Sequence, residues 1–161
     1  MLNPNLNNGG TFTTNKAALV AGTTTTYTTT VAFDYMIDAK WGTQFATKTN
    51  QATPTTDYRT SAAFNALAAS KGCVLVFATT SGGVVKMLQG EIESIDESGE
   101  FVVAPHFPSI PVDVAPFGYV VCVNDSTGSA WTPGTTNWAS VTGFTATFVD
   151  IGMMPSRPQE S

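Results

Sequence analysis

The sequence predicts a mainly β fold, an antiparallel β-sandwich or barrel-like domain with one short α-helix, and three observations lead to this expectation. Short apolar, β-branched runs alternate with polar turns between residues 73 and 123. Threonine occurs 26 times, and its branched side chain with a hydroxyl suits strands that face water without charge. Helical spacing of apolar residues is found in one stretch, between residues 56 and 72.

The chain divides into three parts by composition. A length of 161 residues is enough for one domain with a sizeable core. Residues 1–10, MLNPNLNNGG, are rich in Asn and Gly and predict a flexible N-terminal arm. Residues 11–152 form the predicted β-rich domain, and residues 153–161 form a predicted polar C-terminal tail.

The first strands are expected before residue 50. Residues 11–20 and the threonine-rich residues 23–30 favour extended backbone. Residues 31–37 alternate apolar and polar side chains with a period of two, which predicts a half-buried strand. A turn near residues 39–42 then leads to a hairpin partner that contains Trp41 and Phe45.

One helix is predicted from Tyr58 to Ser70. Asp57 or the residue before it can accept a backbone N–H bond at its start, and Gly72 is a natural residue after its end. Phe64 and Leu67 lie on one face at helical spacing. We expect this helix to lie against the sheet.

Residues 73–103 predict a three-stranded meander. The first strand, residues 73–78, is joined to the second, residues 84–95, by the turn Ser81-Gly82-Gly83. Asp96 and Gly99 form a second turn before a strand that begins at Phe101. The predicted core, including residues of the last two strands, consists of Val74, Val76, Phe77, Leu88, Val102, Val120, Phe144 and Phe148.

Residues 104–118, APHFPSIPVDVAPFG, contain four prolines and many apolar residues. Proline cannot donate to a strand ladder, so the segment is expected to fold over one end of the sheet or to pack on another subunit. Strands follow at residues 118–123 and 142–151. The candidate interface residues, from this segment and the arm, are Phe107, Ile110, Val112, Val114, Phe117, Asn3 and Leu6.

Charge and hydropathy restrict the partners. The net charge is −5, and the seven basic residues are scattered singly, so nucleic acid is not expected as a partner. No apolar run approaches the roughly 18 residues that a membrane span needs, so no membrane partner is expected. The opening residues lack the features of a signal peptide, which favours synthesis in a cytosol, where Cys73 and Cys122 are expected as buried free thiols.

Residues with chemical potential are few, and no catalytic residue, cofactor or metal site is predicted. His106 has no neighbouring serine motif, and two cysteines with one histidine are too few for a zinc site. The acidic residues 91–100 include Glu91 and Glu93 on one strand face, yet a solvated hairpin end explains them as well. Four aromatic residues leave a sugar-stacking platform open as an alternative to core or interface packing, namely Trp41, Tyr119, Trp131 and Trp138.

Several segments resemble small virion structural proteins of tailed bacteriophages. They are TPTTDYRTSAAFNALAASKGCVLVF, GEFVVAPHFPSIP, PFGYVVCV and the ending with RPQ. The resemblance implies an oligomeric, mainly β protein of low charge without enzymatic activity, such as a capsid decoration (cement) protein.

The expected function is therefore structural. The chain is expected to be made in the host cytoplasm and to become a capsid decoration protein of the virion, which bridges and stabilises capsid subunits. Its expected partners are the major capsid protein or other virion proteins and further copies of itself, with a homotrimer favoured by the symmetry of capsid lattices. A tail or fibre component, with or without glycan binding, is the alternative.

Overall fold

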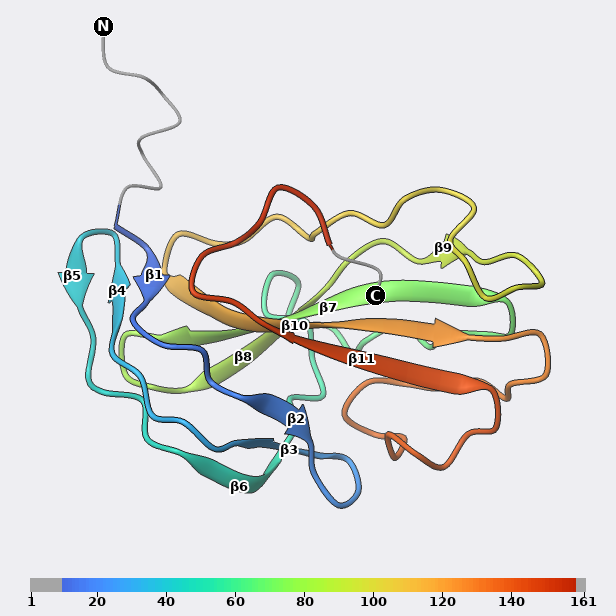
Figure 1. Ribbon diagram of the computed structural model, residues 1–161, viewed down its shortest axis with the longest axis horizontal. Helices are drawn as coiled ribbons and strands as arrows, with labels where there is room; N and C mark the ends of the chain where they lie inside the picture. Colours follow the sequence, from blue (N-terminus) through green and yellow to red (C-terminus); the bar gives the residue numbers. More distant parts are fainter. Residues whose placement is uncertain (1–9, 159–161) are drawn as a thin grey trace, which may run out of the picture.

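The computed structural model describes residues 10–158 and arranges them as three antiparallel sheets packed together (Figure 1). The strands are β1 (Phe12–Thr13), β2 (Leu19–Ala21), β3 (Thr26–Thr29), β4 (Tyr35–Ile37), β5 (Lys40–Trp41), β6 (Lys48–Ala52), β7 (Lys71–Thr80), β8 (Val85–Gln89), β9 (Glu93–Ser94), β10 (Val114–Asn124) and β11 (Phe144–Asp150). The predicted mainly β, sandwich-like fold is confirmed. Most of the predicted arm, residues 1–9 with Asn3 and Leu6, and the tail residues 159–161 lie outside the described residues.

The central sheet has the strand order β11-β10-β7-β8, and β9 also pairs with β7. Its two middle strands, β7 and β10, are the longest, with 10 and 11 residues, and are buried along almost their whole length. Near-continuous burial matches their sequences, since both read as unbroken apolar runs rather than as alternating ones. The other two sheets, β1-β4-β5 and β2-β3-β6, are smaller.

The central sheet separates two hydrophobic clusters. One contains Phe77, Phe117 and Val120 together with side chains from the two small sheets. The other contains Val76, Leu88, Tyr119 and Val121, and is covered by the coil from residue 101 to residue 113 and by the end of the chain. Because side chains of a strand alternate between faces, continuous apolar strands serve both clusters.

Most of the predicted core is confirmed, with one error. The buried residues of the prediction are Val74, Val76, Phe77, Leu88 and Val120, whereas Phe144 and Phe148 are partly buried at the edge of the first cluster. Val102 was predicted to be buried but is 64% exposed. The predicted third strand of the meander does not form, because Phe101 makes only an isolated bridge to Ile95 before the chain leaves the sheet.

The predicted turns are confirmed where glycine or tight geometry requires them. Gly83 and Gly99 have φ values of 75° and 86°, in the left-handed region that favours glycine. The hairpin of β4 and β5 turns at Asp38 and Ala39, whose φ values of 49° and 59° are those of a type I′ turn. The observed turn is therefore two residues long, at residues 38–39, whereas it was predicted near residues 39–42.

The second meander strand is divided at Gly90. An added Cβ at Gly90 would lie 2.9 Å from the carbonyl oxygen of His106 and 3.1 Å from that of Val74. The proline-rich coil therefore crosses the sheet closely at this point, and the predicted strand of residues 84–95 becomes β8 and β9 with a gap between them.

The predicted helix from Tyr58 to Ser70 is wrong, and the structure has no helix among residues 10–158. Ser61 adopts a left-handed φ of 59°, which interrupts a helical path, and Leu67 exchanges two backbone hydrogen bonds with Trp131. A short alanine-rich helix is marginal by itself, so these long-range contacts prevail. Phe64 and Leu67 are nevertheless buried, as the apolar pattern indicated.

The proline-rich segment also differs from its prediction. β10 begins at Val114, four residues earlier than expected, because a register shift between Pro116 and Gly118 accommodates the proline. Val114 and Phe117 therefore belong to a buried strand, and both are 0% exposed. Their placement in a proline-rich coil was wrong: within β10, Val114 packs in the second cluster and Phe117 in the first.

Cys73 and Cys122 are opposite each other in the ladder of β7 and β10, and both are buried free thiols, as predicted. Burial raises the pKa of the Cys73 thiol to about 12, although the side-chain amide of Gln89 lowers it slightly. Burial also raises the pKa of Cys122 well above its usual value. Both thiols are therefore protonated at neutral pH, and neither is an activated nucleophile.

Candidate functional site

An apolar groove lies where the proline-rich coil, the end of the chain and the start of β1 meet. Its volume is about 460 Å³. The coil contributes Phe107, Ile110 and Val112 to its lining, and the end of the chain contributes Met153 and Met154. The structure thus gathers three of the predicted interface residues at one site, with Val114 as part of its buried floor.

The coil that forms one side of the groove is held by packing and not by a ladder. The ring of Phe107 meets Tyr119 of β10 edge to face, with centroids 5.0 Å apart. Pro105 and Pro108 are buried, and they bring no N–H group that would need a partner. The wall of the groove is consequently pre-formed without a regular strand.

The rim of the groove exposes large apolar side chains to solvent. Val112 is 83% exposed, and Met153 is 73% exposed. Fully solvated apolar side chains beside a groove are typical of a contact surface. Sequence reasoning missed Met153 and Met154, which it placed in a polar tail, although two adjacent methionines were a visible signal for an adaptable apolar contact.

Phe117, the remaining predicted contact residue among those described, lies on the opposite face of the central sheet. Its ring packs between aromatic residues of the first cluster, with centroids 5.4 Å from Phe33 and 5.3 Å from Phe45. It takes no part in the groove.

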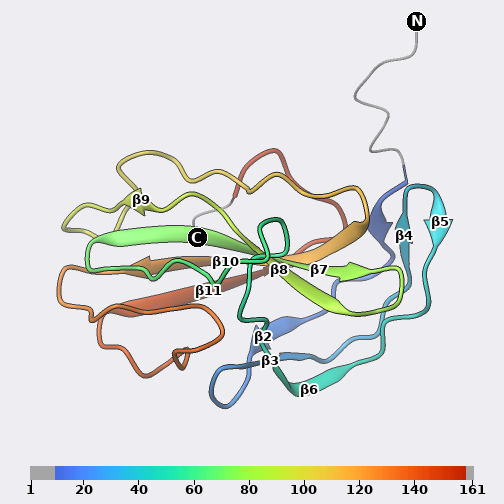
Figure 2. The ribbon, with the colours of Figure 1, turned by 180° about the vertical axis from the view of Figure 1, so that it is seen from behind.

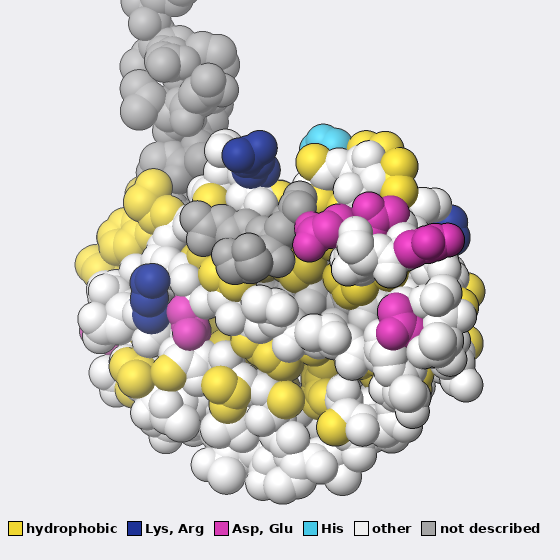
Figure 3. Space-filling view, turned by 45° about the vertical axis from the view of Figure 1, so that its right-hand side comes forward, with side chains coloured by type: hydrophobic (Ala, Val, Ile, Leu, Met, Phe, Trp, Pro, Cys, Tyr) yellow, Lys and Arg dark blue, Asp and Glu magenta, His cyan; other side chains and the backbone are white. Residues whose placement is uncertain are grey.

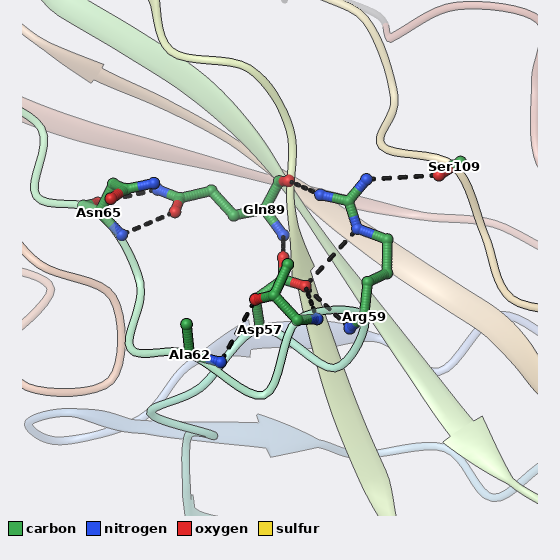
Figure 4. Close-up of polar contacts among 7 residues, drawn as sticks. Asp57, Arg59, Ala62, Asn65, Gln89 and Ser109 are labelled. Atoms are coloured by element: carbon green, nitrogen blue, oxygen red, sulfur yellow. Dashed lines mark hydrogen bonds and ion pairs between the residues drawn. The ribbon is translucent and has the colours of Figure 1, made fainter.

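A second candidate is a polar network beside β8, shown in Figure 4. Asp57 is 6% exposed, and its carboxylate accepts hydrogen bonds from the backbone N–H groups of Gln89 and Arg59, both at 2.8 Å. The guanidinium of Arg59 lies 3.5 Å from the same carboxylate and donates to the carbonyl oxygen of Gln89 at 2.9 Å. Its other end donates to the hydroxyl of Ser109 at 3.3 Å.

The side chain of Gln89 completes this network. Its amide oxygen accepts from the backbone N–H of Asn65, and its amide nitrogen donates to the backbone carbonyl of Asn65, both at 2.9 Å. The side-chain amide therefore pairs with the loop as another peptide group would. Figure 2 shows this loop, residues 53–70, beside β8.

Two polar hollows flank Arg59. One, of about 480 Å³, is bounded by Asn65, Gln89 and Glu91, and the other, of about 420 Å³, reaches His106 and Ser109. The hydrogen-bonding groups of Asp57 and Gln89 are engaged within the protein itself. The arrangement therefore holds the loop against the edge of the sheet.

Among the acidic residues from Glu91 to Glu100, the strand face expected to hold Glu91 and Glu93 does not form, because Glu91 lies between β8 and β9 and Glu93 begins β9. The carboxylate of Asp96 accepts from the hydroxyl and the backbone N–H of Ser98 and from the backbone N–H of Glu100. These bonds, the Ser98 hydroxyl first, lower the pKa of Asp96. The turn is thus stabilised by its own side chain, as in an Asx-turn.

The four aromatic residues considered as a stacking platform are not on one surface. Trp131 and Tyr119 are 0% exposed and Trp138 is 6% exposed, whereas Trp41 is 61% exposed. Trp131 stacks on Phe144 with centroids 4.1 Å apart, within the first cluster. The buried tryptophans are core residues.

The surface carries little charge. Figure 3 shows a face on which charged side chains are few and hydrophobic side chains are exposed between uncharged groups. Within residues 10–158, no group of three or more His, Cys, Asp or Glu residues is close enough to hold a metal ion. The same residues include no helix long and apolar enough to cross a membrane.

Comparison of the chain with protein-family models, curated proteins and solved structures found no match. Among the described residues, the apolar groove is the surface best suited to contact another molecule.

Proposed function

We propose that this protein is a structural component of a tailed-bacteriophage virion, a capsid decoration protein that bridges and stabilises capsid subunits. It is made in the host cytoplasm, binds the major capsid protein or another virion protein, and associates with further copies of itself. The proposal assigns it no catalytic activity.

The observation that carries the proposal is the apolar groove. Its wall is a proline-rich coil that Phe107 anchors on β10, and its rim exposes Val112 and Met153. A pre-formed apolar surface loses little conformational freedom on binding, so it suits a long-lived contact between subunits. The low charge of the chain agrees with this, because the centre of a stable interface is depleted of charged residues.

Quantitative mass spectrometry of purified virions tests the proposal. A decoration protein should be present in on the order of hundreds of copies per particle, because it follows the symmetry of the capsid lattice. A few to about tens of copies would instead assign the chain to a tail or fibre. Absence from washed virions would overturn a structural role.

A pair of substitutions tests the groove itself. Val112→Asp places a charge on the rim, and we expect its incorporation into virions to fall by about tenfold or more. The control is Val84→Asp, since Val84 is also exposed, at 54%, but does not line the groove. Normal incorporation of the Val112→Asp chain would show that the groove is not the contact surface.

A further inference from the structure

The outer strand β11 has an open edge. It is the outer strand of the central sheet, and within residues 10–158 it pairs with β10 alone. Ala146 is partly exposed although its side chain packs toward the first cluster.

The register shows which backbone groups face outward. The carbonyl of Val74 accepts from Gly90 on the β8 side, so by alternation Cys73 directs its N–H and C=O toward β10. Its partner Cys122 directs its backbone N–H and C=O toward β7. The residues on either side of Cys122 in β10 therefore direct their backbone N–H and C=O toward β11. The ladder bonds of β11 are therefore made by Thr145, Thr147 and Val149, and the bond from the N–H of Ile151 to Phe117 follows the same alternation.

The alternate residues of β11, namely Phe144, Ala146 and Phe148, then direct their N–H and C=O groups away from the sheet. For the N–H groups of Ala146 and Phe148, no acceptor is found in the part of the chain that the structure describes. The N–H of Phe144 bonds the carbonyl of Val141 at 3.3 Å, while its own carbonyl faces outward.

This edge lacks the usual protection against pairing. Natural edge strands carry lysine, proline or a bulge, or they are covered by a loop. Residues 144–149 contain no charged residue and no proline, and their register with β10 is continuous. Asp150 is the nearest charge, and its carboxylate accepts from the backbone N–H of Leu19, so β2 lies beside this end of β11 and the uncovered part of the edge is residues 144–148.

The sequence of this edge is self-complementary. Residues 144–148 read Phe-Thr-Ala-Thr-Phe, which is the same in both directions about Ala146. Antiparallel pairing of two copies about Ala146 would place Phe144 opposite Phe148 of the second copy, and Thr145 opposite its Thr147. Aromatic pairs and threonine pairs are favourable cross-strand neighbours.

We propose that β11 pairs antiparallel with β11 of a second copy, about a two-fold axis at Ala146. The outward groups then meet in register: the N–H of Ala146 donates to the carbonyl of Ala146 in the other copy, and the N–H of Phe148 donates to that of Phe144. The charges are compatible, because the paired residues 144–148 carry none. The contact continues the central sheet across both chains and is independent of the role in the virion.

The first test is a proline substitution that removes only an outward donor. Ala146→Pro deletes an N–H that the β10 ladder does not use, and proline is tolerated at such edge positions. Sedimentation equilibrium up to about 100 micromolar should show a dimer for the wild type and a dissociation constant raised by about tenfold or more for Ala146→Pro. A wild type that stays monomeric, or an oligomer that the variant leaves unchanged, would overturn the proposal.

The second test exchanges charges on exposed side chains, so it does not depend on tolerance of proline. In the proposed register, residue 145 of one copy faces residue 147 of the other. The variants Thr145→Lys with Thr147→Lys and Thr145→Glu with Thr147→Glu should each be monomeric, because like charges then face each other.

Two arms of this test should restore pairing. An equimolar mixture of the all-Lys and all-Glu variants should form a heterodimer, and the variant Thr145→Glu with Thr147→Lys should form a homodimer. The all-Lys and all-Glu chains carry the same two substituted positions and serve as controls for each other. Homodimers of all variants alike, or no association in the mixture, would contradict the pairing at β11.

Discussion

The two edge strands of the central sheet, β8 and β11, differ in whether their outward backbone groups have partners. Beyond β8, the loop of residues 53–70 covers the edge, and Asp57 accepts a bond from the outward N–H of Gln89 at 2.8 Å. Beyond β11, the corresponding outward groups of Ala146 and Phe148 meet no partner within residues 10–158. One edge is completed by side chains of the same chain, and the other is available to a second chain.

The covered edge shows how a buried carboxylate can serve a fold. Asp57 lines one of the two hollows and contacts an arginine, an arrangement that in isolation would resemble a catalytic group. One of its oxygens, however, accepts from the outward N–H of Gln89, which an additional strand would otherwise pair. The polar network thus replaces a strand, which explains why it is associated with β8 and absent from β11.

The largest expected effect acts on the strands between the edges. Burial raises the pKa of Cys73 to about 12 from a value of 9.0, and it raises the pKa of Cys122 as well. Above pH 9 the unfolded chain loses thiol protons that the native chain retains, so stability falls as pH rises from about 9 toward the raised pKa of Cys73, by on the order of 1 kcal/mol per pH unit. Cys122 contributes in the same direction. Denaturant unfolding at a series of alkaline pH values measures this slope.

The control for the alkaline effect is the double variant Cys73→Ala with Cys122→Ala. Its slope should be shallower but not zero, because burial also raises the pKa of Tyr27 to about 12. The cavities left by the thiols lower stability at every pH and do not alter this slope. Equal slopes for the two proteins would show that the thiols ionise alike in the native and unfolded states.

The next largest effect on stability is expected when the loop that covers the β8 edge loses its anchoring carboxylate. Asp57→Ala leaves the N–H groups of Gln89 and Arg59 without their acceptor, and we expect a loss of about 2–4 kcal/mol in unfolding free energy. The control is Asp34→Ala, whose exposed carboxylate makes no hydrogen bond among the described residues and should change stability by less than about 0.5 kcal/mol. Similar losses of unfolding free energy for both variants would show that Asp57 does not stabilise the β8 edge.

A smaller effect is expected at the β11 edge. Phe148 is partly buried and meets Trp138 edge to face with centroids 5.2 Å apart. Phe148→Ala should therefore lower the unfolding free energy by about 1–3 kcal/mol, less than a fully buried phenylalanine would. Thr147→Ala, on the exposed face of the same strand, is the control. Measurement in dilute solution separates this packing from self-association, and a loss equal to that of the control would contradict the packing.

The smallest effect concerns individual amides and compares the edges directly. In dilute solution the amides of Ala146 and Phe148 should exchange with solvent faster than the amide of Gln89, because only the last has an internal acceptor. Hydrogen exchange followed by NMR measures these rates. Raising the protein concentration should slow the two β11 amides and leave Gln89 unchanged; equal rates at every concentration would remove the distinction between the edges.

Contacts between distant segments explain why some predictions from the sequence were wrong. The apolar face of residues 58–70 was identified correctly, but a helix was inferred from it, and the bonds between Leu67 and Trp131 that prevent the helix join residues far apart in the sequence. Val114 and Phe117 were assigned to a surface coil because Pro116 was expected to end a ladder, whereas a bulge accommodates it. The groove depended on Met153 and Met154 meeting the proline-rich coil, a contact that no local pattern contains.

The sequence by itself determined the features that depend on near neighbours. Alternation and apolar runs located β4, β7 and much of β10, and the glycines at positions 83 and 99 located two turns, because side-chain direction and φ are local properties. The tertiary structure alone decided which strands became neighbours, which edge was covered and which apolar residues remained in solvent. Those outcomes depend on contacts between distant segments, in which backbone groups and apolar surfaces compete for partners across the whole chain.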